Sequence, residues 1–224
     1  MDIAIVHYNT PELTRAAILS VRKHCPDADV TVFDNSDQRP FRPWSSNISY
    51  IDNTAGRVID WDAFLAQFPD RVPTCNGHGS AKHARSVDEL FDLLPDGFIL
   101  MDSDCLLKAD PSPLADPSVA WSGTCYANRW VARERIPRLL PMLCWLNVPL
   151  CRSHGVRYFD PERSWKLKPR QFWDTGASFL ADCDAAQLTG RSRNIWRFVE
   201  HYGHGSWNGE DPAQWLEENK NLYI

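Results

Sequence analysis

The sequence lacks the features that mark membrane-spanning, exported and nucleic-acid-binding chains. No uninterrupted apolar run approaches the roughly 18 residues of a membrane span, and no succession of basic, apolar and small residues typical of a signal peptide opens the chain. A basic excess is also missing: the net charge is -5, which argues against a general nucleic-acid binder. We therefore expect a cytoplasmic protein that has no nucleic-acid partner and that meets anionic ligands with local charges.

Paired cysteines are lacking as well. The chain has 7 cysteines, an odd number, and no two of them form a CxxC pair that would suggest zinc or redox chemistry. We therefore expect reduced thiols, mostly buried. The seven are Cys25, Cys75, Cys105, Cys125, Cys144, Cys151 and Cys183.

The 224 residues contain enough apolar material for the core of one large domain, since 43% are hydrophobic and 24% charged. The first quarter alternates strand and helix patterns. Short apolar strands are expected at 3–7, 30–33 and 48–51, and a helix follows the first of them, with Thr10 as N-cap and Pro11 at its first position. This alternation predicts an α/β fold with a mostly parallel sheet.

The chemistry is expected where the most apolar strand ends. Residues 98–101 are all apolar, as in a parallel strand buried on both faces, and they run directly into Asp102-Ser103-Asp104. Two carboxylates one residue apart are costly unless a cation neutralises them, and Mg²⁺ and Mn²⁺ prefer such oxygen ligands combined with substrate phosphates. The pattern therefore indicates a divalent-metal and diphosphate site; the alternative is a simple turn.

The second half of the chain is less regular. A strand is expected at 177–180, and residues 129–150 mix arginines, among them Arg138, with tryptophans and leucines. A basic, aromatic surface of this kind could touch anionic membrane lipid or a lipid-linked acceptor. The alternative is a lid or core-covering segment whose apolar residues pack and whose arginines are solvated.

Five motifs occur in the order in which family-2-type GT-A glycosyltransferases have them. They are IAIVHYNTPELTRAAILSV at 3–21, VFDNSD at 32–37, the apolar strand leading to DSD, WDTGASFL at 173–180 and HYGHGSW at 201–207. The chain resembles this family over nearly its whole length. The resemblance implies a GT-A-like mostly parallel sheet flanked by helices in a single domain, 1–224, with a nucleotide-sugar-binding half at 1–108 and an acceptor-binding half at 109–224.

The resemblance also implies roles for individual residues. By position, Tyr8 and Asn9 would border the nucleotide base, and Asp34 would hydrogen-bond the base or ribose. Asp104, together with Asp102, would bind the metal and the ribose-diphosphate. The implied cofactor is Mn²⁺ or Mg²⁺.

Histidines in two glycine-containing segments are further candidates. His201 matches the family's metal or diphosphate ligand better than His204 does, and a neutral imidazole can complete a Mn²⁺ shell begun by carboxylates. Residues 76–80 are expected as a loop before a helix over 80–94, with Ser80 as N-cap. His83 matches a donor-binding position of related sequences.

One departure from the family concerns the base. Many relatives carry a Glu-Asp pair between the TGA-like strand and the C-terminal His motif, and this chain has none there. The nearest pair, Glu210-Asp211, comes after the His motif, where Asp211 is better explained as an N-cap before Pro212. Asp174, directly before the expected strand at 177–180, remains as the acid most able to face an acceptor hydroxyl; its alternative role is to hold the loop.

The sequence therefore predicts a metal-dependent glycosyltransferase that moves a sugar from a nucleoside-diphosphate sugar to the hydroxyl of a saccharide or lipid-linked saccharide. Such a role fits the synthesis of cell-surface polysaccharide or glycoconjugates, in the cytoplasm or peripherally at the inner membrane face. Two alternatives stay open. One is a nucleotidyltransferase that makes sugar nucleotides, although its usual Gly-rich basic loop after the first strand is replaced by Tyr8-Asn9-Thr10-Pro11. The other is a nucleotide-sugar-binding module without turnover.

Overall fold

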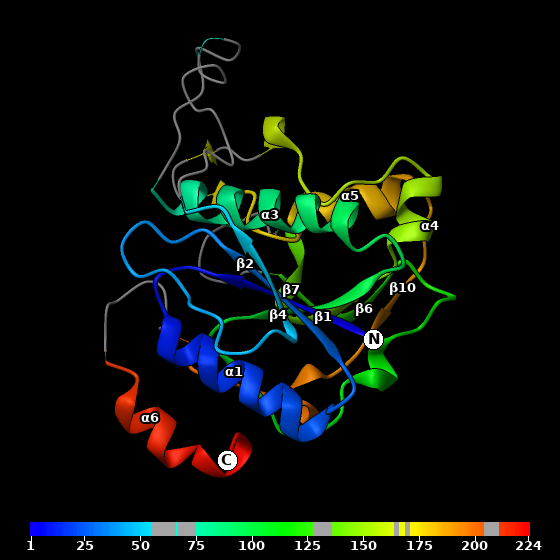
Figure 1. Ribbon diagram of the computed structural model, residues 1–224. Helices are drawn as coiled ribbons and strands as arrows, with labels where there is room; N and C mark the ends of the chain where they lie inside the picture. The colour runs from blue at the N-terminus through cyan, green and yellow to red at the C-terminus, as the bar shows by residue number, and fades with distance from the viewer. Residues whose placement is uncertain (55–65, 67–74, 128–135, 164–165, 169–170, 204–210) are drawn as a thin grey trace.

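The computed structural model describes residues 1–54, 66, 75–127, 136–163, 166–168, 171–203 and 211–224. A central sheet lies between helical layers: α3 and α5 cover one face, and α1 covers the other (Figure 1). The arrangement is an α/β fold, as the alternation of strand and helix patterns predicts.

The elements have the following bounds. The strands are β1 Asp2–His7, β2 Asp29–Asp34, β3 Ile48–Asp52, β4 Phe98–Asp102, β5 Cys105–Leu107, β6 Trp121–Ala127, β7 Pro137–Leu146, β8 Lys166–Lys168, β9 Gln171–Phe172, β10 Gly190–Ser192 and β11 Val199–His201. The α-helices are α1 Pro11–His24, α3 Cys75–Leu93, α4 Val148–Ser153, α5 Ala177–Ala185 and α6 Ala213–Glu218. Short 3-10 turns are η1 Ser112–Leu114, η2 Pro161–Arg163, η3 Ile195–Arg197 and η4 Lys220–Leu222.

The main sheet has seven strands in the order β10-β6-β7-β4-β1-β2-β3. Strands β4, β1, β2 and β3 are mutually parallel, with Ile3 opposite both Val30 and Ile99. β7 runs antiparallel to β4 and to β6, whereas β10 is parallel to β6. The sheet is therefore mostly parallel, and it takes strands from both sides of position 108.

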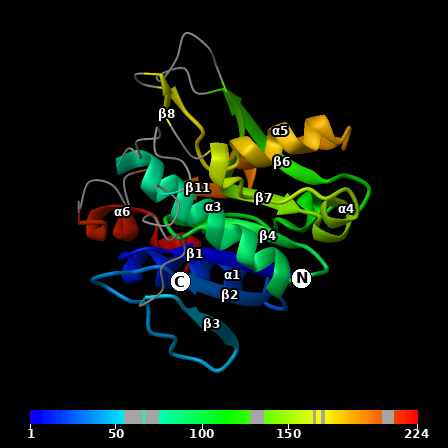
Figure 2. The same ribbon diagram turned by 90° about the horizontal axis from the view of Figure 1, so that it is seen from above.

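The core occupies both faces of this sheet. Residues 98–101 of β4 are fully buried, as expected of a strand covered on both sides. Ile3 and Ile5 of β1 point to the cluster under α1, while Ala4 and Val6 belong to the cluster under α3. Because side chains alternate along a strand, one apolar run supplies both clusters. Figure 2 shows the same layers from above.

Two predictions for the second half are wrong. Residues 177–180 begin helix α5 and form no strand, because a short apolar run has no periodicity that separates a strand from a buried helix. Gly176 enters the helix with a φ of 80°, and a Cβ there would lie 2.2 Å from the carbonyl oxygen of Leu139. Within the stretch at 129–150, Pro137–Leu146 form strand β7 inside the main sheet, so this part is not a lid; contact with membrane lipid stays a prediction. Arg129 and Trp130 lie outside the described residues.

Helix boundaries also differ from expectation. Helix α3 begins at Cys75, so the segment 76–80 lies inside the helix and Ser80 is not an N-cap. Thr10 is the N-cap residue of α1 but its side chain makes no capping hydrogen bond. Pro212 and not Asp211 is the N-cap residue of α6, although Oδ1 of Asp211 accepts a 3.0 Å hydrogen bond from the backbone N–H of Ala213 at the start of the helix.

The expectation for the cysteines is confirmed where the structure describes them. Six are free thiols; Cys125 is half-buried and the other five are buried. Among the described residues, no helix combines the length and the apolar character that crossing a membrane requires.

Candidate active site

The acidic motif lies at the carboxyl edge of the parallel strands. Asp102 is the last residue of β4, and β5 begins at Cys105, so Ser103 and Asp104 form a two-residue link between the strands. Polar side chains at this edge are where ligands of open α/β sheets bind.

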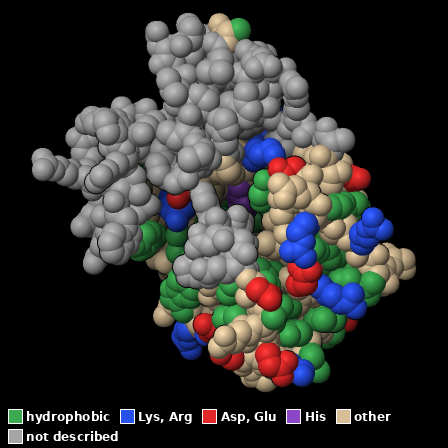
Figure 3. All heavy atoms as spheres, turned by 90° about the vertical axis from the view of Figure 1, so that its left-hand side faces the viewer, with side chains coloured by type: hydrophobic (Ala, Val, Ile, Leu, Met, Phe, Trp, Pro, Cys, Tyr) green, Lys and Arg blue, Asp and Glu red, His purple; other side chains and the backbone are tan. Residues whose placement is uncertain are grey.

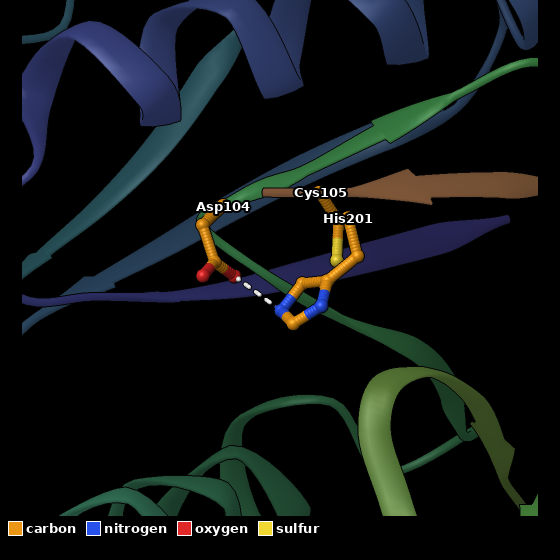
Figure 4. Close-up of side chains that lie close together, drawn as sticks. All are labelled: Asp104, Cys105 and His201. Carbon is orange, nitrogen blue, oxygen red and sulfur yellow. Dashed lines mark ion pairs between the residues drawn. The ribbon is translucent and has the colours of Figure 1, made fainter. Parts of the chain in front are cut away.

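His201 reaches the motif through strand pairing. β11 runs antiparallel to β5, and the register sets His201 opposite Cys105. The Nε2 atom of His201 then lies 3.3 Å from Oδ1 of Asp104, with 17% and 13% of the two side chains exposed (Figure 4). Residues far apart in the chain are thus joined by a backbone ladder and not by a flexible loop.

The electrostatics of His201 reflect this acidic surrounding. Burial acts to lower the pKa of His201, but the hydrogen bond with Asp104 and the negative charges of Asp104 and Asp102 outweigh it. The net effect is a pKa raised above the usual 6.5. The two carboxylates therefore favour a positive charge at this position, either a proton on the ring of His201 or a bound cation that replaces this proton.

The donor set fits a divalent cation that prefers oxygen. Ligand atoms of Asp104, Cys105 and His201 lie within 4.8 Å of one another. Cys105 is fully buried, and burial raises the pKa of its thiol well above the usual range, so it remains protonated and is a poor ligand. Asp104 and His201 remain of this group, which does not include Asp102, and a carboxylate with an imidazole suits Mn²⁺ or Mg²⁺.

His83 connects the acidic motif to the turn before α5. Its Nε2 lies 3.1 Å from Oδ1 of Asp102, and its Nδ1 lies 3.0 Å from Oγ1 of Thr175. Both ring nitrogens are therefore engaged by protein atoms. The histidine is held between β4 and the 174–176 turn, and its predicted contact with the donor stays a prediction.

Asp174 is held by three donors. Its Oδ1 accepts hydrogen bonds from Ser80 Oγ at 2.6 Å and from the backbone N–H of Thr175 at 2.8 Å, and its Oδ2 forms an ion pair with Arg138. The sequence prediction that the arginines of this stretch are solvated is wrong for Arg138, whose side chain is 17% exposed. No pattern in the sequence could have found this pair, because it joins β7 to a turn 36 positions later.

A second group of predicted residues lies at the end of β1. Tyr8 donates a 3.1 Å hydrogen bond to Asp37, and the amide of Asn9 donates to the same carboxylate at 2.6 Å. Asn9 has a φ of 55°, a left-handed conformation that asparagine tolerates better than most residues. Its side-chain oxygen also accepts hydrogen bonds from the backbone N–H groups of Gln38 and Arg39, which fixes the loop after β2 against the end of β1.

Asp34 also holds the loop after β2, through hydrogen bonds of its buried side chain. The side chain is fully buried, and its oxygens accept hydrogen bonds from the N–H groups of Ser36 and Phe41 and from the hydroxyl of Tyr50. Burial and this hydrogen bond raise the pKa of Tyr50 above its usual range. Asp34 therefore holds the loop after β2, and its predicted hydrogen bond to the base or ribose stays a prediction.

The two groups adjoin. Oγ1 of Thr10 lies 3.2 Å from Oγ of Ser103, which links the end of β1 to the acidic motif. The ammonium of Lys82 lies 5.6 Å from the centre of the Tyr8 ring.

Among the residues predicted from the sequence, His204 lies outside the described residues. Figure 3 shows a histidine side chain in the hollow on this side of the molecule, near basic and acidic groups.

The sequence matches no family model and has no significant match among curated proteins. Its fold is similar to solved structures. One is the galactosyltransferase LgtC in complex with donor and acceptor sugar analogues, at 14% identity and a TM-score of 0.57, covering 100% of this chain and 95% of that one. Another is mouse xyloside xylosyltransferase 1, at 10% identity and a TM-score of 0.52, covering 99% and 91%. The likeness shows the GT-A-like fold that the sequence predicts, and family 2 in particular stays a prediction.

Proposed function

We propose that the chain is a metal-dependent glycosyltransferase that uses a nucleoside-diphosphate sugar. The observation that carries the proposal is the contact between Asp104 and His201 beside Asp102, at the carboxyl edge of a GT-A-like sheet. The carboxylates of Asp102 and Asp104 make the surroundings of His201 negative, which favours a divalent cation that displaces the proton from the imidazole. The likeness to two sugar transferases supports the same class of reaction.

In this proposal Asp102, Asp104 and His201 hold Mn²⁺ or Mg²⁺. When bound, such an ion neutralises the charge that develops on a departing diphosphate. The protein's own contribution is to fix the ligands: β4 ends at Asp102, β11 presents His201, and His83 holds the Asp102 carboxylate from behind.

The donor would lie across the edge formed by β4 and β1. Tyr8 and Asn9 border the base in this arrangement, and the loop that Asn9 and Asp34 fix forms the far wall. His83, predicted as a donor-binding residue, serves the donor through Asp102.

Asp174 is proposed as the base that takes the proton of the acceptor hydroxyl. A chain of contacts supports this role by joining its turn to the acidic motif, since Thr175 contacts His83 and His83 contacts Asp102. Its three donors, two on Oδ1 and one on Oδ2, leave one lone pair of Oδ2 to accept that proton. Its alternative role is to hold Arg138 and the 174–176 turn. The acceptor is proposed as a saccharide, free or lipid-linked, in the synthesis of surface polysaccharide or glycoconjugates.

A thermal-shift screen tests the function. Nucleoside diphosphates and nucleotide sugars are added with and without Mn²⁺, and a true ligand at 100 times its dissociation constant should raise the stability by about 2.7 kcal/mol. Stabilisation that requires both Mn²⁺ and a nucleoside diphosphate supports the proposal. Release of free sugar from the stabilising donor then separates an enzyme from a binding module, and formation of nucleotide sugar from a nucleoside triphosphate would indicate the nucleotidyltransferase. No stabilisation by any diphosphate would contradict the proposal.

A further inference from the structure

Two half-exposed aromatic side chains flank the site without belonging to the metal cluster. Trp196 on η3 is 46% exposed, and Tyr126 near the end of β6 is 37% exposed. The ring centre of Trp196 lies 6.5 Å from that of His201, with the ring planes tilted by 47°. Large aromatic side chains usually bury most of their surface, so an exposed pair at this place offers apolar faces to a ligand. We refer to Trp196 and Tyr126 as the aromatic pair.

Trp196 is exposed on a fixed turn. Ile195, its neighbour, is fully buried in the core under α1. The N–H of Trp196 donates a 3.1 Å hydrogen bond to Oδ1 of Asn194, and the N–H of Phe198 donates a 2.8 Å bond to the carbonyl oxygen of Ile195. Because the turn is held at both ends, little conformational freedom would be lost when a ligand covers the indole.

Strand β6 connects Tyr126 both to the turn that carries Trp196 and to the arginine that contacts Asp174. The N–H of Ile195 donates to Oγ1 of Thr124 at 3.3 Å, which attaches η3 to β6 two residues before Tyr126. Tyr126 is paired with Arg138 across β6 and β7. Side chains of directly paired residues share one face of a sheet, and Arg138 carries the ion pair with Asp174. Trp196 therefore lies beside His201, and Tyr126 is paired with the arginine that forms the ion pair with Asp174.

A nucleotide base is not the occupant of this surface. The residues that border the base in the proposed function lie at the end of β1, and β7 and β4 separate β6 from β1 in the sheet. A pyranose ring fits better, because its C–H face is attracted to the negative face of an aromatic ring while its hydroxyls stay free for polar groups. The stacked face of a neutral hexose needs no charged partner, and neither Trp196 nor Tyr126 supplies one.

We propose that the aromatic pair is the acceptor subsite, in which a neutral hexose ring of a saccharide stacks on Trp196 and the adjoining sugar lies against Tyr126. This inference rests on the proposed function, since the stacked sugar directs its hydroxyl towards the metal cluster and Asp174. The subsite extends the site by two residues that no motif of the sequence marks.

Saturation-transfer NMR tests the subsite with defined probes, the methyl glycosides of glucose, galactose, mannose and N-acetylglucosamine. The protein is saturated with Mn²⁺ and the nucleoside diphosphate that stabilises it most. At least one glycoside should bind, with transfer strongest to its ring C–H protons. Trp196→Ala should weaken that binding by about 10-fold and Trp196→Phe by less than about 3-fold, since a tenfold loss is about 1.4 kcal/mol, the upper range of one aromatic stacking contact.

Trp44→Ala is the matched control. Trp44 is 40% exposed, like Trp196, but it stacks on Arg15 of α1. Its loss should leave glycoside binding unchanged. All variants should bind the metal and diphosphate as the native protein does, which separates a failure of the subsite from a failure of the proposed function. Equal glycoside binding by Trp196→Ala, or none by the diphosphate-saturated native protein, would overturn the subsite. Self-association that Trp196→Ala abolishes would overturn it too, by assigning the aromatic pair to an interface between copies.

Discussion

Oδ1 of Asp104 and Nε2 of His201 lie 3.3 Å apart because antiparallel pairing of β5 with β11 holds their backbones side by side. The ladder does not depend on either side chain. Substitutions at these two positions can therefore remove ligand atoms while the strands that carry them stay paired. The loss of a metal ligand can then be measured separately from any loss of the fold.

His201→Ala should raise the Mn²⁺ concentration needed for half-maximal rate by about 10-fold or more, since groups merely behind a ligand already contribute 10- to 100-fold in metal affinity. Steady-state rates across a Mn²⁺ titration measure this. His154→Ala, which removes an exposed histidine after α4, is the control and should behave as the native protein. His204→Ala should have a smaller effect than His201→Ala; the reverse order would move the ligand to His204.

His83→Ala should weaken Mn²⁺ binding by about 10-fold although His83 is no ligand, because Asp102 loses the ring that holds its carboxylate. Direct titration of Mn²⁺ followed by electron paramagnetic resonance reads the affinity without any substrate. Arg85→Ala changes the same helix at a side chain that pairs with Asp88 and Glu89, and it should leave the affinity unchanged. Equal Mn²⁺ affinities of native protein and His83→Ala would contradict the support of Asp102 by His83 and would leave direct contact with the donor as the proposed role of His83.

Asp174→Asn should keep the affinity for metal and diphosphate but lower turnover by roughly 10²- to 10⁴-fold if the carboxylate takes the acceptor proton. Calorimetry and initial rates measured on the same preparation show whether binding and rate separate. Ser80→Ala removes one hydrogen bond to Asp174 and keeps the carboxylate, so its turnover should fall far less. Retained turnover in Asp174→Asn would assign Asp174 to holding Arg138 and the turn.

His7 should make the stability of the native protein depend on pH. Burial lowers the pKa of His7 below its usual 6.5, against the attraction of Asp34, and the ring contacts Thr14 and the carbonyl oxygen of Arg39. Between the lowered pKa and 6.5 the unfolded chain binds more protons than the folded one. The stabilisation is therefore present above pH 6.5 and is lost as the pH falls through this window, by at most about 1.4 kcal/mol per pH unit.

The check compares urea unfolding of native protein and His7→Gln at about pH 7.5 and about pH 5.5, on either side of the usual histidine pKa. At the higher pH the native protein should have a larger free energy of unfolding than His7→Gln, and this difference between the two proteins should be smaller at the lower pH. All other titrating groups are common to both proteins and cancel in the difference. A gap that widens on acidification would contradict the sign derived for His7.

The first half of the fold could be predicted because its central strands β1 and β4 are mostly apolar and buried. Residues 98–101 lie in a parallel strand buried on both faces, so their composition alone indicates both the strand and the edge at which Asp102 and Asp104 emerge. The second half could not be predicted in this way. The run at 177–180 fits a strand as well as a helix, and only the packing of Phe179 and Leu180 under the sheet decides for the helix.

The candidate site also has a part that the sequence predicts and a part that it does not. Asp102, Asp104, His201 and Asp174 carry motif patterns that the sequence displays. Their partners do not: the contacts of His83 with Thr175 and of Asp174 with Arg138 join segments that no local pattern relates. For Asp34 the family resemblance implies a hydrogen bond to the base or ribose, which stays a prediction, and the structure adds its full burial and its hold on the loop after β2.

The most direct test of the account is calorimetric titration of the stabilising nucleoside diphosphate, with and without Mn²⁺, into native protein and Asp104→Ala. The account predicts Mn²⁺-dependent binding to the native protein and its loss in the variant, with an unfolding transition that stays cooperative, because this partly exposed carboxylate serves the ligand and not the core. Unchanged affinity of folded Asp104→Ala for the diphosphate in Mn²⁺ would contradict the metal assignment.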